Sequence, residues 1–318
     1  MKIKQIYQEI VKTGIENDPR GKQAITKTLK EQEAVFKNLK PDQKNYFDKE
    51  SLANPYADTR IVWADENQEV KNILVGIDID TSDILLADRL SQKGKQIDLV
   101  ISHHPTGNAF INFYEVMDLQ IDIFHEAGIS LSTSENLLME RKRQVERKII
   151  GANYSRTYDA AKLLGVNLLC MHTPCDNMVH TYLRKLFIKT KPENLEQLLS
   201  ILLKIPEYSE AAKNNCPPRI LLGTPKSKVK NIHLEMTGGT EGPIEIYKEL
   251  SNKGIDTLVS MHLSEEHFKA AQKENLNVVI AGHISSDSLG VNLMLDKVFD
   301  NKKVDIVNNS GFRRFSHK

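Results

Sequence analysis

The sequence predicts an α/β protein with largely parallel sheets and a helical N-terminal extension. From residue 71 onward, short apolar runs alternate with segments of helical spacing, and the second half of the chain repeats this alternation. Strands that alternate with helices favour parallel sheets, and short continuous apolar strands fit sheets that are covered on both faces. Residues 1–60 are polar and charged, with apolar residues at helical spacing, which is typical of helices at a surface.

Each element follows from local pattern and punctuation. In the extension, one helix face is formed by Ile3, Ile6, Ile10 and Val11, and a second by Ala24, Leu29, Ala34 and Leu39. Strands are expected at 71–80, 97–102, 167–171, 219–222, 231–236, 256–261, 277–281 and 304–307. Helices are expected at 82–94, over most of 112–165 with breaks at Gly128 and Gly151, from 172 to 189, and at 195–204, 243–254, 265–275 and 287–300.

The chain has 318 residues, which is enough for one large or two ordinary domains. We expect a helical extension over 1–60, a first α/β lobe with a helical insertion over 61–190, and a second lobe over 191–318. Lys plus Arg total 43 and Asp plus Glu total 42, so the formal charge is +1. That balance argues against nucleic acid as a partner.

No apolar run approaches the length of a membrane helix, so we expect no membrane partner. The three cysteines form neither a disulfide framework nor a zinc-finger spacing. The N-terminal segment lacks the apolar core of a signal peptide. The interpretation is a cytoplasmic protein.

Histidines follow the expected strands, at the point where each strand ends. The strand at 97–102 leads into His103 and His104, and later strands lead into His172, His262 and His283. In open α/β sheets, ligands bind beyond the carboxyl ends of the strands. A single such histidine is more often structural, but four strands with the same feature indicate a site.

Two of these histidines begin the same pattern, His-x-x-x-Asp, which gives His172 with Asp176 and His283 with Asp287. Imidazole and carboxylate together suit Zn, Fe, Mn, Co or Ni. The alternative for each aspartate is helix N-capping. The predicted donors are too many for one closed zinc site and fit two divalent ions; they are His103, His104, Asp176, His283 and Asp287.

At these residues the sequence resembles the NGG-interacting-factor-three-like family of dinuclear-metal proteins, the GTP cyclohydrolase type 2 homologues. The resemblance runs from about residue 55 to the C-terminus and rests on the stretches ILVGIDID (73–80), LVISHHP (99–105), HTPCD (172–176), TGGTEG (237–242) and AGHISSD (281–287). It implies that the five donors are metal ligands. It also implies two similar α/β lobes that face each other across a dimetal cleft, and a homo-oligomer, commonly a hexamer.

The sequence departs from the family pattern in three places. Asp287 stands where the family usually has Glu, so its carboxylate has a shorter reach. The family's Trp-Asp-Asn-x-Gly-Leu stretch is present only as the diverged segment 57–65, and the segment between His104 and Asp176 is long. We therefore expect a divergent member with its own substrate entrance.

The loop at 237–242 follows a strand and precedes an expected helix that starts with proline. Amides at a helix start can hold an anion, so Gly238, Gly239 and Thr240 are candidates for anion or substrate binding, with a tight structural turn as the alternative. His172 and His262 are the candidates for proton transfer. A structural role is the alternative for each.

Two functions remain open from the sequence. The first is a metal-dependent hydrolase that acts on a small molecule, either like GTP cyclohydrolase type 2 or on phosphoesters and nucleotides. The second is a non-catalytic metal-binding protein for assembly or partner interaction. Exchangeable water at the metals, in a cleft with polar lining, would distinguish the enzyme from the second function.

Overall fold

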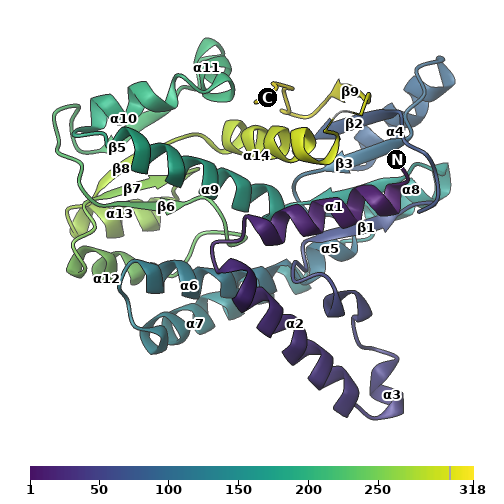
Figure 1. The fold of residues 1–318 in the computed structure, drawn as a ribbon, viewed down its shortest axis with the longest axis horizontal. Helices are drawn as coiled ribbons and strands as arrows, with labels where there is room; N and C mark the ends of the chain where they lie inside the picture. The colour runs from purple at the N-terminus through teal and green to yellow at the C-terminus, as the bar shows by residue number, and fades with distance from the viewer. Residues whose placement is uncertain (301) are drawn as a thin grey trace.

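A computed structural model describes residues 1–300 and 302–318. It confirms the predicted α/β class and the helical N-terminal extension. The chain forms two mixed sheets, one of five strands and one of four, that lie at opposite ends of the molecule with helices between and around them (Figure 1).

The first sheet has the strand order β1-β4-β3-β2-β9. Its strands are β1 (Thr59–Trp63), β4 (Leu168–Met171), β3 (Leu99–Ser102), β2 (Asn72–Gly76) and β9 (Asp305–Asn308). The edge strand β1 is antiparallel to β4, and the other pairs are parallel. The last strand of the chain therefore belongs to the first sheet; the predicted domain boundaries stay a prediction.

The second sheet repeats this arrangement. Its order is β5-β8-β7-β6, from β5 (Arg219–Leu222), β8 (Asn277–Ile280), β7 (Thr257–Ser260) and β6 (Ile232–Glu235). The edge strand β5 is antiparallel, and the other pairs are parallel. Each sheet thus runs from its first strand through its fourth and third to its second, which brings the carboxyl ends of the third and fourth strands together.

The extension begins with α1 (Ile3–Glu16), whose four predicted core positions are all buried. α2 (Gly21–Asn38) also forms, but it projects from the body with α3 (Pro41–Lys44), and Ile25 is its one buried residue (Figure 1). The predicted second helix is thus confirmed, but its predicted apolar positions are at most partly buried, because α2 packs mainly against α1 and a short 3-10 helix, η1 (Lys49–Leu52). This 3-10 helix leads back to β1.

The helical insertion forms as predicted, with breaks at Gly128 and Gly151. Its elements are α5 (Asn108–Ile111), η2 (Phe113–Asp118), α6 (Leu119–Glu126), α7 (Leu131–Ile150) and α8 (Arg156–Leu164). α8 packs beside α4 (Thr81–Gln92), whereas α6 and α7 extend toward the second lobe. The remaining helices of the second half are α10 (Leu195–Leu202), α11 (Pro206–Lys213), α12 (Ile246–Asn252) and α13 (Glu265–Lys273).

The centre of the molecule is the pair of helices α9 (Thr173–Thr190) and α14 (His283–Val298), which follow β4 and β8. A Cβ atom on Gly290 would lie 2.6 Å from the carbonyl oxygen of Cys175, so glycine allows this close approach. Two predicted helix starts are wrong. The helix expected at 287 begins at His283, and the one expected at 243 begins at Ile246.

Within the described residues, no helix combines the length and apolar character needed to cross a membrane.

Candidate metal centre

The predicted donors gather where the two lobes meet. His103 and His104 follow β3, Asp176 lies in the first turn of α9, and His283 and Asp287 lie one turn apart on α14. Because α9 packs against α14, the N-terminal turns of these two helices, one from each lobe, lie close together. The structure thus brings together all five residues that the sequence singled out.

The carboxylate of Asp287 lies at the centre of this group. Its Oδ1 is 3.5 Å from His103 Nε2, and its Oδ2 is 3.4 Å from His104 Nε2 and 3.5 Å from His283 Nε2. Asp176 Oδ1 is 3.3 Å from His103 Nε2. A carboxylate whose two oxygens face different imidazoles has the arrangement that suits a bridge between two ions.

Three buried polar atoms in this group, each able to ligate a metal, have no hydrogen-bond partner: His103 Nε2, Asp176 Oδ1 and Asp287 Oδ2. Unpaired buried polar atoms carry a free-energy penalty, and converging lone pairs need a cation between them. Two sets that could each hold an ion share these atoms, namely His103 with Asp176 and Asp287, and His104 with His283 and Asp287. The donor set therefore fits one or more divalent ions.

The capping alternative for the aspartates is excluded by where the helices begin. α9 starts at Thr173 and α14 at His283, so Asp176 and Asp287 lie inside their helices and cap neither. In α14 the helix itself places His283 and Asp287 on one face, because residues four apart are neighbours on a helix surface. Asp176 and Asp287 therefore contribute to the cluster and do not cap a helix.

The pKa values of the cluster residues also show that its carboxylates interact strongly with positive charge. Burial raises the pKa of Asp287, but His103 and His104 outweigh it and hold the pKa well below its usual range. Burial lowers the pKa of His104, but the carboxylates of Asp287 and Asp78 outweigh it and raise the pKa to about 9. Protons on the imidazoles or divalent ions can supply this positive charge, and an ion would displace the protons.

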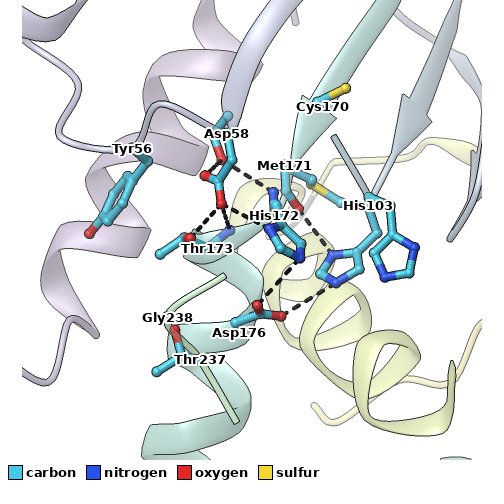
Figure 2. Close-up of polar contacts among 12 residues, drawn as sticks. Tyr56, Asp58, His103, Cys170, Met171, His172, Thr173, Asp176, Thr237 and Gly238 are labelled. Carbon is cyan, nitrogen blue, oxygen red and sulfur yellow. Dashed lines mark hydrogen bonds and ion pairs between the residues drawn. The ribbon is translucent and has the colours of Figure 1, made fainter. Parts of the chain in front are cut away.

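His172 lies in the cluster as well, and its imidazole is held from behind (Figure 2). Asp58 Oδ2 is 2.8 Å from His172 Nδ1 and also accepts a hydrogen bond from the Thr173 hydroxyl at 2.6 Å. His172 Nε2 then points at Asp176 Oδ2, 3.6 Å away. Together with His103 and His104, His172 forms a third set that could hold an ion, so its position is that of a ligand as much as of a proton carrier.

The other two cluster histidines from the first lobe, His103 and His104, are oriented in the same way. His103 Nδ1 is 3.2 Å from the carbonyl oxygen of Met171, and His104 Nδ1 is 2.7 Å from Asp78 Oδ1. When the outer ring nitrogen is bound to an acceptor, the inner Nε2 is left free with its lone pair toward the centre. This orientation from behind is typical of metal-binding histidines.

His262, the second candidate for proton transfer, lies at the edge of the cluster. Its ring centroid is 4.7 Å from that of His283, but it belongs to none of the possible ion-holding sets among the described residues. Glu241 Oε1 lies 3.7 Å from His262 Nδ1, and the Ser264 amide donates to the same oxygen. The nearby carboxylate of Glu241 is the main cause that raises the pKa of His262.

The glycine loop lies beside the cluster, but its surroundings differ from the expectation. Gly238 and Gly239 have φ angles of +99° and +84°, which favour glycine. Gln120 of α6 donates from Nε2 to the carbonyl oxygens of Gly238 and Thr240. Because α12 starts only at Ile246, the loop amides do not form a helix start, and the premise of the anion prediction is wrong; binding by Gly238, Gly239 and Thr240 stays a prediction.

Sequence reasoning missed Asp58, Asp78 and Glu241, which hold the histidines in place. Asp78 follows β2 within the stretch ILVGIDID, so an acidic residue beyond a strand end was a visible signal. Asp58 lies in the diverged segment 57–65 that precedes the first predicted strand, and that segment forms β1.

The fold and the cluster together define an α/β protein of two lobes with a histidine and carboxylate centre between them. No family model and no curated protein matches the chain. Solved structures do match. A NIF3 superfamily protein from Sphaerobacter thermophilus is 24% identical with a TM-score of 0.70, over 80% of this chain and 91% of that one.

A second similar structure is reduced HcgD from Methanocaldococcus jannaschii. It is 16% identical with a TM-score of 0.50, over 84% of this chain and 94% of that one. These likenesses confirm, at the level of the fold, the resemblance seen in the sequence: the chain has the fold of the NIF3 superfamily protein.

Proposed function

We propose that this protein belongs to the NIF3 family, holds two divalent transition-metal ions between its lobes, and hydrolyses a small molecule there. The observation that carries the proposal is the buried cluster in which both oxygens of Asp287 face imidazole nitrogens from the two lobes. The ligands in this proposal are His103, His104, Asp176, His283 and Asp287, with His172 beside them. Nitrogen and oxygen donors of this kind suit Zn, Fe, Mn, Co or Ni.

A pair of such ions, when bound, would polarise a carbonyl or phosphoryl oxygen and lower the pKa of water. The chain's own contribution is to orient the donors and to move a proton. Asp58 and Asp78 hold His172 and His104 with Nε2 inward. His262, held by Glu241, is half-exposed beside the cluster and can carry a proton to a leaving group.

The cavity next to the cluster supports the hydrolase over the storage function. It is lined by Asp176, His283 and Asp287 on one side and by Thr240 and Glu241 of the glycine loop on another. A small cavity that opens onto the cluster would give a substrate access to bound ions, whereas a storage site needs no such space.

The test combines metal analysis with a substrate panel. The protein is stripped of metal, reconstituted separately with Zn, Mn, Fe or Co, and assayed on phosphoesters, nucleotides and amides. We expect metal-dependent hydrolysis of one class, and its loss in Asp287→Asn, which removes a charged donor. Asp287→Glu, which restores the residue usual in the family, should retain metal. Full metal loading without turnover on any class would contradict the hydrolase.

A partner-binding role is the second candidate, and the projecting α2–α3 arm favours it. Val35 on α2 is 51% exposed and Tyr46, just after α3, is 92% exposed. Exposed apolar side chains on a projecting helix are typical of protein contacts. The homo-oligomer, a hexamer by family resemblance, and a cytoplasmic location remain proposals alongside this one.

A further inference from the structure

The cavity beside the metal cluster has an unusual charge. Its walls carry four carboxylate residues, and none of the described residues that line it is Lys or Arg. Asp176 and Asp287 face the cluster, where divalent ions would balance them. Glu235 and Glu241 line the same cavity from β6 and from the glycine loop, and neither belongs to a set of residues that could hold an ion among the described residues.

Glu241 is already satisfied, but Glu235 is not. Glu241 accepts from the Ser264 amide at 2.6 Å and lies within 4 Å of His262 and His267. Glu235 accepts a long hydrogen bond from the Tyr247 hydroxyl at 3.4 Å, and Ser260 and His262 also favour its charged form, but no cation lies within ion-pair distance of it among the described residues. Burial raises the pKa of Glu235 to about 7, as expected for a carboxyl group without a cation.

Gln120, which also lines the cavity, has an unpaired acceptor. Its side-chain amide cannot be flipped, because Nε2 donates to the carbonyl oxygens of Gly238 and Thr240 at 2.8 and 2.7 Å. Its Oε1 is therefore fixed, and it has no hydrogen-bond partner, although Gln120 is only 5% exposed. A buried acceptor without a donor is costly, and a donor from a ligand removes the cost.

His233 supplies no positive charge to balance these acceptors. It lies two residues before Glu235, so both side chains extend from the same face of β6. Burial lowers the pKa of His233 to about 3, so its imidazole is neutral, and it stacks on Phe124 at 6.0 Å. The cavity thus offers acceptors and an aromatic wall, without Lys or Arg among its described residues, and its His262 imidazole is already paired with Glu241.

We infer that this cavity binds a nitrogen group that donates hydrogen bonds, an amidinium or amide, and that it excludes carboxylate and phosphate groups, with Glu235 as the specificity-determining residue. The inference rests on the proposed function in that the cavity is taken as the substrate pocket of the metal centre. It assigns the charged phosphates of a nucleotide, if one binds, to the outside of this cavity. It also disfavours anion binding at the cavity face of the glycine loop.

The test uses three probes of one shape and different charge: benzamidine, benzamide and benzoate. Each is titrated calorimetrically into the metal-loaded and the metal-free protein. In the metal-free protein no ion can ligate benzoate, and the positive charge of His104 is balanced by Asp78 and Asp287. Benzamidine should therefore bind at least about tenfold more tightly than benzoate, with benzamide between them. Equal binding of benzamidine and benzoate, or no binding of benzamidine, would overturn the inference.

The isosteric variant Glu235→Gln assigns the preference to one residue. It should weaken the binding of benzamidine by about tenfold and change the affinity for benzamide by no more than about twofold. The matched control is Glu245→Gln, an exposed glutamate that does not line the cavity, and it should change neither. Unchanged benzamidine affinity in folded Glu235→Gln would remove Glu235 from the pocket. If that variant fails to fold, the comparison of probes on the unaltered chain still decides.

These outcomes are separable from the fate of the hydrolase. Probe binding is measured without turnover and in the absence of metal. A protein that prefers benzamidine but hydrolyses nothing would contradict the proposed function and support the pocket. A metal-dependent hydrolase that binds benzoate as well as benzamidine would do the opposite.

Discussion

The two lobes share a strand order and a turn but use the turn differently. β3 leads into Ser-His-His at 102–104, and β7 leads into Ser-Met-His at 260–262. In both, the serine hydroxyl donates to the carbonyl oxygen two residues on, at 2.7 Å. Met261 thus stands where the first lobe has His103, the most buried histidine of the cluster.

The carboxylates behind the second histidines differ as well. Asp78, just beyond β2, holds His104 with Nε2 toward Asp287, whereas Glu241, beyond β6, holds His262 at the edge of the cluster. One turn, used twice, thus places both of its histidines in the cluster in the first lobe, whereas in the second lobe it places one histidine at the cluster's edge.

The largest effect is expected from the two matched histidines. His262→Gln should lower turnover by about 100-fold or more, because a positioned proton carrier is lost, and should leave metal content unchanged. His104→Gln should lower metal content and turnover together. Elemental analysis and steady-state kinetics on both variants measure this. If His262→Gln also lost metal, the division of roles between the lobes would be wrong.

The next effect concerns the carboxylates that orient the histidines. Asp58 is fully buried behind His172, whereas the Asp78 side chain is 68% exposed. Replacing a residue that orients a ligand typically costs about 10- to 100-fold in metal affinity. Asp58→Asn should therefore reduce metal affinity by about 100-fold, and Asp78→Asn by about 10-fold or less. Competition with a chelator measures both affinities, and the reverse order would contradict the role given to burial.

The packing between the lobes gives a smaller effect, on stability. Gly290→Ala puts a Cβ atom 2.6 Å from the carbonyl oxygen of Cys175. That oxygen belongs to the backbone of α9 and cannot easily move away. The substitution should lower the free energy of unfolding by about 1–3 kcal/mol. Gly151→Ala is the matched control, because no atom lies within 4 Å and its φ is −80°. Urea unfolding compares them; equal stability would mean that α9 and α14 pack less closely.

The smallest effect is a pH dependence of the metal-free protein. The pKa of His104 rises from 6.5 to about 9 on folding, so its stabilisation is complete below 6.5 and is lost as pH rises through 9. Unfolding free energy should therefore fall between about pH 7 and 9.5 without metal, and less steeply in His104→Gln. Bound ions should flatten the slope, because they replace the protons. A flat profile without metal would contradict the coupling of His104 to the carboxylates.

The five clustered residues can be predicted from the sequence because their signals are local. A strand that ends in histidine marks the sheet edge where ligands bind, and a histidine and aspartate four residues apart share one helix face. The residues behind them were not predictable, since Asp58 lies 114 positions from His172 and only the fold brings them together. The same holds for Gln120, which reaches Gly238 across 118 positions.

Local pattern also misled in identifiable ways. Pro243 after the glycine loop is typical of a helix start, but the loop is held by Gln120 and Arg141 from the insertion, and α12 begins three residues later. In α2, helical spacing predicts the helix correctly, but it does not predict which other elements the helix packs against. A projecting helix has the same pattern as a packed one, so exposure of the arm was not visible in the sequence.

The central claim is that the two lobes jointly hold a pair of divalent ions, and elemental analysis of three variants tests it most directly. His103→Ala removes a donor from the first lobe and His283→Ala one from the second, and each should lose at least one of two ions per chain. His262→Ala, the matched control outside the donor set, should keep both. Unchanged stoichiometry in His103→Ala and His283→Ala would contradict the claim.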